Sequence, residues 1–374
     1  MRKSILKVHL YVALAASVFL LVIGGTGCLL VFELSMDRWW DSSVAFVEPH
    51  GDPASLDAML ATLRTAFPGG KLTELDLGGP DASIIAKISA PSGPQRVFVN
   101  PYSGEILGAR AGESISFHLR HAHRELLAGK PGALLVNCIS VLLVFQSLSG
   151  LYLWWPLKRV TVKVGASWRR FNFDLHHAAG FFSSAFICVL AVTRVVKAYT
   201  PDLQPFFDRI TNSPSMTRAL PSKPVAGSAL HAPLDTVVAA ARAKLPGAMV
   251  ARIQPPAGKD GSWVVSMKYP EDSTVPGRSY IVVNQYNGEI LGVQDSRTAP
   301  LGTQITIQNR AIHVGGIYGA PTRILAFLTA LAVLVQTLTG LQMWWRKRKA
   351  TPARRDHSSI ALSPAETVTR GSGK

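Results

Sequence analysis

Four histidines stand at repeated positions in the chain, each close to one end of a long hydrophobic segment. His9 and His176 are 167 positions apart, and His123 and His313 are 190 positions apart. Neutral imidazole is a common ligand of iron, copper and zinc, and ionisable groups at membrane depth are costly and usually functional. The pattern predicts two metal-binding pairs, which we name the inner pair (His9 and His176) and the outer pair (His123 and His313). The alternative is that all four lie in the membrane–water interface and bind nothing.

The apolar residues of the chain gather in four segments. These segments are residues 9–32, 132–155, 177–193 and 324–345. Each approaches the roughly 20 residues needed to cross a hydrocarbon core of about 30 Å, and they show almost no polar stripe of the kind found in soluble helices. The sequence therefore predicts four transmembrane helices. The first segment is too long for the apolar part of a signal peptide, and G-G-T-G at 24–27 is a poor cleavage site, so we expect an uncleaved helix.

The formal net charge of +16 is concentrated next to the apolar segments rather than in one nucleic-acid-binding patch. The basic residues beside the segments are Arg2, Lys3, Lys7, Lys158, Arg159, Lys163, Arg169, Arg170, Arg346, Lys347, Arg348, Lys349, Arg354 and Arg355. The positive-inside rule places all of them in the cytoplasm, with both termini. The two long segments between the helices are then periplasmic, and no nucleic-acid partner is expected.

The chain contains an internal duplication. Residues 146–155 read Q-S-L-S-G-L-Y-L-W-W, and residues 336–345 read Q-T-L-T-G-L-Q-M-W-W. Residues 100–108, N-P-Y-S-G-E-I-L-G, match N-Q-Y-N-G-E-I-L-G at 284–292, and each follows an alternating run typical of a strand. A helical pattern precedes each of these turns, at 55–67 and 234–245. Each half is therefore expected to contain a helix, a small α+β domain and a second helix.

The predicted fold is an internally duplicated α-helical membrane protein with four transmembrane helices and two periplasmic α+β domains. The expected boundaries are 1–33 for the N-terminal tail and helix one, 34–130 for the first domain, 131–156 for helix two, 157–175 for a cytoplasmic loop, 176–198 for helix three, 199–320 for the second domain, 321–346 for helix four and 347–374 for a cytoplasmic tail.

Haem fits the histidine pairs better than a metal ion. No acidic residue lies inside the apolar segments, and the three cysteines, Cys28, Cys138 and Cys188, all lie within them. A large apolar bundle that offers only imidazoles favours bis-histidine ligation of haem. Because the chain has no C-x-x-C-H motif, the prediction is two non-covalent haems b, one near each membrane face and on the order of 20 Å apart.

Several other polar residues have two interpretations. Arg194 follows the third apolar segment and is either a snorkelling anchor or a cation for the propionates of the outer haem. Gln146 and Gln336 either bond between helices or approach the inner haem, and packing is the favoured interpretation. The histidines that could replace a proposed ligand are His118, His121 and His177, and those assigned no role are His50, His231 and His357.

The sequence resembles the PepSY-associated transmembrane family over nearly the whole chain. The residues that carry the resemblance are V-H-L at 8–10, D-L-H at 174–176, I-H at 312–313, the two N-x-Y-x-G-E-I-L-G turns and the paired G-L-x-x-W-W endings. Within the family the chain is similar to the FoxB-type ferrisiderophore reductases, dihaem proteins of the bacterial inner membrane. It departs from many members at Arg194. Those members have a glycine after the threonine at this position, as this chain has at Thr26 and Gly27.

The resemblance implies PepSY-like periplasmic domains and an oxidoreductase that passes electrons through two haems to a ferric siderophore, so that Fe(II) is released. The sequence has no nucleotide-binding motif, so the electron donor is expected to be a separate cytoplasmic reductase, a flavin or a membrane quinol. Two other functions stay open: a sensor or regulatory protein that acts through its PepSY-like domains, and a permease for iron or siderophore. The identity of the siderophore, the haem potentials and the oligomeric state do not follow from the sequence.

Overall fold

The fold was analysed in a computed structural model, which describes residues 1–158, 160–214, 220–224, 232–272, 274 and 276–350. Five residues named above lie outside this part of the chain: Arg159, His231, Arg354, Arg355 and His357. Most of the predicted cytoplasmic tail, from residue 351 onward, also lies outside it.

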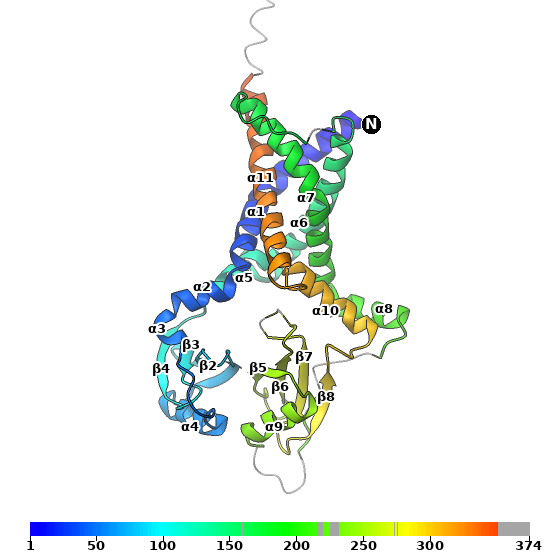
Figure 1. The fold of residues 1–374 in the computed structure, drawn as a ribbon. Coiled ribbons are helices and arrows are strands. Elements are labelled where there is room, and N and C mark those ends of the chain that lie inside the picture. Colours follow the sequence, from blue (N-terminus) through cyan, green and yellow to red (C-terminus); the bar gives the residue numbers. More distant parts are fainter. Residues whose placement is uncertain (159, 215–219, 225–231, 273, 275, 351–374) are drawn as a thin grey trace, which may run out of the picture.

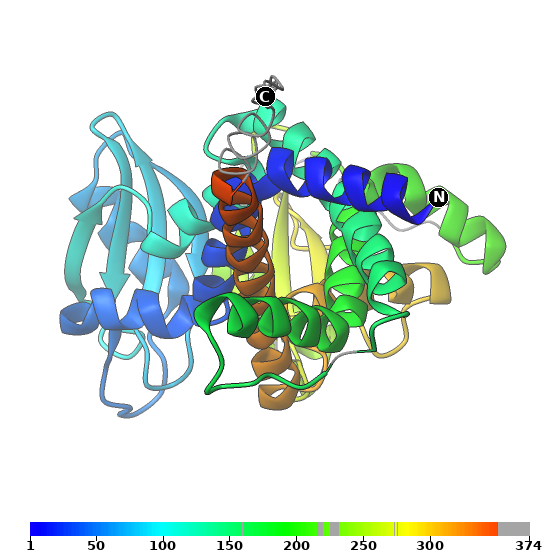
Figure 2. The same cartoon turned by 90° about the horizontal axis from the view of Figure 1, so that it is seen from above.

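Four long helices form a bundle (Figure 1). They are α1 (Arg2–Leu30), α6 (Gly129–Trp154), α7 (Trp168–Ala198) and α11 (Ala320–Ala350). All four are long and apolar enough to cross a membrane, as the sequence predicts. Helices α1 and α7 each pack against both α6 and α11, so α1 and α7 occupy opposite corners of the bundle (Figure 2). The two helices that carry the inner-pair histidines, α1 and α7, therefore lie diagonally opposite each other in the bundle.

Helix α7 begins inside the segment 157–175 that the sequence assigns to a loop. Its first turns are polar, so the hydropathy pattern conceals them. They are helical because their polar groups are satisfied: Asn172 donates to the Thr339 carbonyl of α11 at 3.0 Å, and Arg170 forms an ion pair with Asp174 at 2.8 Å. The i,i+4 spacing of that ion pair suits a helix.

Shorter helices link the bundle to a β-sheet (Figure 1). They are α2 (Glu33–Trp40), α3 (Ser42–Ala45), α5 (Ile115–Glu125), α8 (Thr200–Ile210) and α10 (Leu301–His313). Helix α5 packs against α1 and α6, and α10 packs against α7 and α8. We call this end of the bundle the sheet end, and the other, where α1 begins, the N-terminal end.

The eight strands form one antiparallel sheet in the order β4-β3-β2-β1-β5-β6-β7-β8. The strands are β1 (Lys71–Asp76), β2 (Ile84–Ala90), β3 (Gly93–Val99), β4 (Ile106–Ala111), β5 (Met249–Gln254), β6 (Ser262–Lys268), β7 (Ser279–Asn284) and β8 (Ile290–Gln294). The sequence predicts two separate domains, but β1 and β5 pair through Leu75 with Ile253 and Asp76 with Arg252. The two sets of strands therefore close each other's exposed edge and form a single sheet.

One face of the sheet is covered by α4 (Leu56–Ala66) and α9 (Leu234–Lys244), which lie on the side away from the bundle (Figure 1). Residues from both halves share one hydrophobic core beneath these helices. The helices also cap each other: Asp57 accepts from the backbone N–H groups of Leu234 and Asp235, at 2.8 and 3.0 Å. Asp235 in turn accepts from the backbone of Leu56, at 2.9 Å. A carboxylate at a helix N-terminus satisfies otherwise unpaired donors, so each half stabilises the other.

The two repeated glycine motifs form equivalent turns between β3 and β4 and between β7 and β8. Gly104 and Gly288 have φ of +73° and +74°, which favours glycine at both positions. The side chains of Asn100 and Asn284 each accept the backbone N–H two residues ahead, at 2.9 Å. The strand–turn–strand prediction is therefore correct in both halves.

Candidate functional site

The structure places the outer pair outside the four long helices. His123 lies in the last turn of α5, and His313 is the last residue of α10. The sequence placed both at the outer ends of helices two and four, but the backbone breaks in between: Leu126 adopts a left-handed conformation after α5, and Gly315 does so after α10. The two histidines consequently approach the bundle from short helices that lie across its sheet end (Figure 1).

The two rings of the outer pair lie at a distance suited to a shared metal. Their centroids are 6.5 Å apart and their planes are inclined by 58°. Two imidazoles on opposite sides of one metal have centres about 6 Å apart, since each metal–nitrogen bond is about 2 Å and each ring centre lies about 1 Å behind its nitrogen. The spacing therefore fits one metal between the rings.

The hydrogen bonds of the outer pair fix which ring nitrogen is available. His123 Nδ1 is 2.9 Å from the Ile23 carbonyl oxygen, and His313 Nδ1 is 3.1 Å from the Leu190 carbonyl oxygen. A carbonyl oxygen only accepts, so both Nδ1 atoms carry the proton and both Nε2 atoms keep a lone pair. Ligating histidines are usually held in this way, with the second nitrogen donating to a carbonyl.

Two threonines complete the same arrangement in both halves. Thr26 Oγ1 is 3.2 Å from His123 Nδ1, and Thr193 Oγ1 is 3.0 Å from His313 Nδ1. Thr26 and Thr193 are 167 positions apart, as the inner-pair histidines are. The sequence interpretation did not select these threonines, although their matching positions were a signal that could have identified them.

Burial keeps the outer pair neutral. It lowers the pKa of His123 to about 4, although the bond to a backbone carbonyl opposes this, and the charges of Arg194, Lys197 and Arg124 lower it further. Burial also lowers the pKa of His313 to about 3, with Lys197 and Arg194 contributing in the same direction. Both imidazoles are therefore unprotonated near pH 7, which is the form that binds a metal.

The inner pair is held by hydroxyl groups. His9 Nδ1 is 2.8 Å from Ser149 Oγ on α6, and His176 Nδ1 is 2.8 Å from Thr339 Oγ1 on α11. Ser149 donates its own proton to the Phe145 carbonyl at 2.7 Å. Thr339 likewise donates within its helix, to the Val335 carbonyl at 2.6 Å. Each hydroxyl therefore accepts from Nδ1–H, and the Nε2 lone pairs stay available.

Glycines provide the room for the inner-pair rings. A Cβ atom at Gly150 would lie 3.4 Å from the His9 ring, and one at Gly340 would lie 3.5 Å from the His176 ring. The glutamines of the repeated motif bond to the same histidines: Gln146 donates to the His9 carbonyl and Gln336 to the His176 carbonyl, both at 3.0 Å. The glutamines thus make the interhelical packing contacts that the sequence analysis favoured.

The alternative histidines make local contacts. His177 Nδ1 bonds to the Phe173 carbonyl one turn earlier, at 2.9 Å. His121 Nδ1 bonds to the Glu125 carboxylate in the same helix, and His118 packs edge-on against Phe117. Among the described residues, no group of three or more His, Cys, Asp or Glu side chains could hold a metal ion.

Arg194 lies at the sheet end of α7, next to the outer pair. Its Nη2 donates to the Arg124 carbonyl at 3.3 Å, whereas its Nε is buried and has no partner within the described part of the chain. The equivalent position in the first half is Gly27, where a Cβ atom would lie 3.3 Å from the His123 ring. Arg194 therefore offers a buried donor that an anionic oxygen would satisfy.

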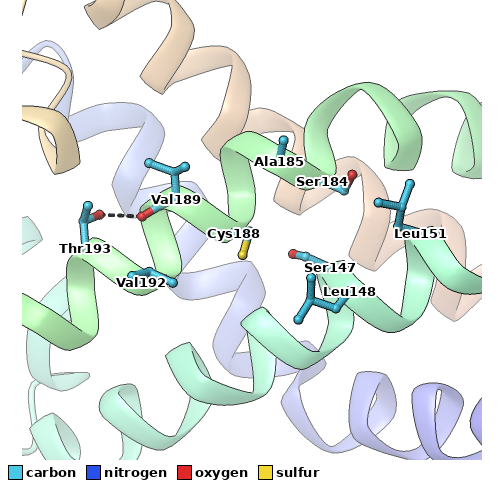
Figure 3. A pocket seen from close by; sticks show the side chains of 9 residues that line it. All are labelled: Ser147, Leu148, Leu151, Ser184, Ala185, Cys188, Val189, Val192 and Thr193. Atoms are coloured by element: carbon cyan, nitrogen blue, oxygen red, sulfur yellow. Dashed lines mark hydrogen bonds between the residues drawn. The ribbon is translucent and has the colours of Figure 1, made fainter.

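A hollow opens between α6 and α7, and Thr193 is one of its lining residues (Figure 3). Its other lining residues are Ser147, Leu148, Leu151, Ser184, Ala185, Cys188, Val189 and Val192. The hydroxyl of Thr193 donates to the Val189 carbonyl of its own helix at 2.8 Å (Figure 3). The hydroxyl of Ser147 likewise donates within its helix, to the Leu143 carbonyl at 3.0 Å. The hollow is thus an apolar surface that suits hydrocarbon.

Comparison with known families identifies one match. The model described as the PepSY-associated TM region matches residues 6–347, which is most of the chain, and the chain belongs to this family. The comparison with curated proteins finds no match.

Proposed function

We propose that this member of the PepSY-associated family carries electrons across the bacterial inner membrane and reduces a ferric siderophore on the periplasmic side. Two haems b, one held by the outer pair and one by the inner pair, would form the path. In this proposal the N-terminal end of the bundle and both termini are cytoplasmic, as the basic clusters there favour, and the sheet end is periplasmic.

The observation that carries the proposal is the geometry of the outer pair. The two imidazoles are neutral and partly buried, and their ring centroids are 6.5 Å apart. Each donates its Nδ1 proton to a carbonyl, so that both Nε2 lone pairs are available. Two such imidazoles could together hold the iron of one haem. The unpartnered Nε of Arg194 fits a propionate oxygen beside them.

The protein itself has a limited chemical task in this mechanism. Haem supplies reversible one-electron chemistry at iron. The histidines would hold and orient the metal, and the acceptors of their Nδ1 protons fix the tautomer. Arg194 would neutralise a carboxylate, and the apolar helices would exclude water. No proton transfer or covalent step is required of any side chain.

Reduction is sufficient to release iron from a siderophore. Hydroxamates and similar siderophores are hard oxygen chelators that hold Fe(III) tightly, and the softer Fe(II) binds to such ligands less well. The electrons would come from a cytoplasmic reductase, a flavin or a membrane quinol. The protein would then need only a suitable potential and a surface where the chelate approaches the outer pair.

The test is the optical spectrum of protein purified from haem-supplied cells. We expect a Soret band that shifts to longer wavelength with dithionite and returns when a ferric chelate is added. His123→Ala and His313→Ala should each remove about half of the haem, because each pair holds one of the two groups, whereas His50→Ala should remove none. A colourless protein would refute the proposal, as would uptake of iron or siderophore by proteoliposomes without any reductant, which indicates a permease. Activity that survives without the outer pair would favour a sensor.

A further inference from the structure

The two halves of the protein differ in charge next to the outer pair. Helix α7 carries Arg194 and Lys197 at its sheet end, whereas the equivalent positions of α1, 167 residues earlier, are Gly27 and Leu30. Both cationic side chains are partly buried and both act electrostatically on His123 and His313. The duplicated framework therefore has two cations on one side of the outer pair and none at the matching positions on the other.

Two acidic residues of the neighbouring short helices have partners of their own. Glu33 accepts from Arg120 at 2.7 Å and also acts electrostatically on Lys197, and Glu125 bonds to the His121 ring. Arg124 adds a third positive charge that acts on His123. The environment of the outer pair is therefore positive.

The charges near the inner pair are arranged differently. Asp174, two residues before His176, is buried and forms an ion pair with Arg170 at 2.8 Å, so the two charges offset each other. Lys7, two residues before His9, is exposed. Because water screens exposed charges much more than buried ones, Lys7 acts on the inner pair less than the partly buried Arg194 and Lys197 act on the outer pair.

We propose that Arg194 and Lys197 make the outer centre the stronger oxidant of the two and so give electron transfer its direction. The inference rests on the proposed function. A nearby positive charge stabilises an added electron and a nearby negative charge destabilises it. One electron moves from the iron held by the inner pair to the iron held by the outer pair, so the first is oxidised as the second is reduced. The reductant at the inner end is a quinol or reduced flavin.

The experiment is a spectroscopic redox titration of the purified dihaem protein. The double variant Arg194→Met/Lys197→Met keeps the length and apolar character of the side chains but removes both charges. We expect the equilibrium constant for reducing the outer centre to fall at least about tenfold, which is about 59 mV for one electron, while the inner centre is unchanged. The two potentials are assigned with His9→Ala, which removes an inner ligand.

Three further variants make the test specific. Arg194→Lys keeps the charge and should keep the potential. Lys197→Met alone should give a smaller shift of the same sign, and it leaves Arg194 in place if the double variant loses haem. Arg297→Met removes a charge that is paired with Glu271 on the sheet and should shift neither potential.

The outcomes separate the inference from the proposed function. The inference would be overturned, and the function left standing, by either of two results for a protein that binds two haems. In the first, both potentials stay unchanged in the double variant and in Lys197→Met. In the second, both potentials shift equally. Wild-type protein that binds no haem would overturn both.

Discussion

Removing the hydroxyl of Ser149 tests how the inner pair is held. His9 Nδ1 donates to Ser149 Oγ at 2.8 Å, and within the described part of the chain it has no carbonyl acceptor of the kind found in the outer pair. Ser149→Ala therefore leaves a half-buried imidazole N–H without its acceptor. The same reasoning applies to Thr339→Val and His176.

The magnitude follows from the lost bond. Leaving a buried donor unsatisfied costs about 1–3 kcal/mol, and each 1.4 kcal/mol corresponds to about a tenfold change in an equilibrium constant. We therefore expect the affinity for the inner haem to fall roughly 5- to 100-fold, in line with the effect of removing the partners of other ligating histidines. The outer haem of the same variant should keep its affinity.

The outer pair provides the contrast. Thr26→Val removes one acceptor near His123 Nδ1, but the Ile23 carbonyl remains at 2.9 Å. Thr193→Val likewise leaves the Leu190 carbonyl beside His313. The affinity for the outer haem should change by less than about threefold, since most of the hydrogen-bond energy is retained.

Titration of haem into haem-depleted protein in detergent measures these affinities, with each site observed separately in variants that lack the other pair. Ser147→Ala and Thr337→Val are matched controls, because among the described residues those hydroxyls bond to carbonyls of their own helices, at 3.0 and 2.8 Å, and to no histidine. Equal affinities for Ser147→Ala and Ser149→Ala would refute the reasoning.

Two further predictions concern stability. Asp57→Ala should destabilise the sheet by about 1–2 kcal/mol through loss of a helix cap, and Asp235→Ala should do so by at least as much. Limited proteolysis and the thermal midpoint of the sheet measure both effects. A midpoint equal to that of wild type would contradict the capping role. The pKa of His123 is lowered to about 4 and that of His313 to about 3, so between pH 6.5 and those values the unfolded chain binds more protons than the folded one. The haem-free protein should therefore be fully stable above pH 6.5 and lose thermal stability as the pH falls, and His123→Gln/His313→Gln should flatten that dependence.

Much of the architecture could be predicted from the sequence because repeated motifs give the same local signals twice. The four apolar segments, the glycine turns and the amphipathic helices over each half of the sheet all depend on contacts within a few tens of residues. The repeated offsets also indicated which histidines belong together. The structure places the outer pair ring to ring, with matching acceptors in the two halves.

The features that the sequence did not reveal depend on contacts between distant segments. Pairing of Leu75 with Ile253, which joins the two sets of strands, leaves no local pattern because either strand could have remained an edge. The hydropathy pattern does not reveal helical turns that are polar, such as those at the start of α7. The hydroxyls of Ser149 and Thr339 were inside a motif that was recognised, but their role requires knowing which helix lies opposite.

Contacts between the sheet and the short helices support the outer pair. His123 lies on α5, and the N-terminus of α5 is held by Asp37 of α2, which accepts from the backbone N–H of Ser116 at 3.0 Å and from its hydroxyl at 2.5 Å. At the end of α2, Asp41 forms a buried ion pair with Arg96 of β3. A buried pair of this kind is weak evidence for stability, but breaking it by removing one partner is strongly destabilising. The position of the His123 ring therefore depends on the sheet as well as on the bundle, and an isolated bundle would lack part of the support that holds its outer ligand.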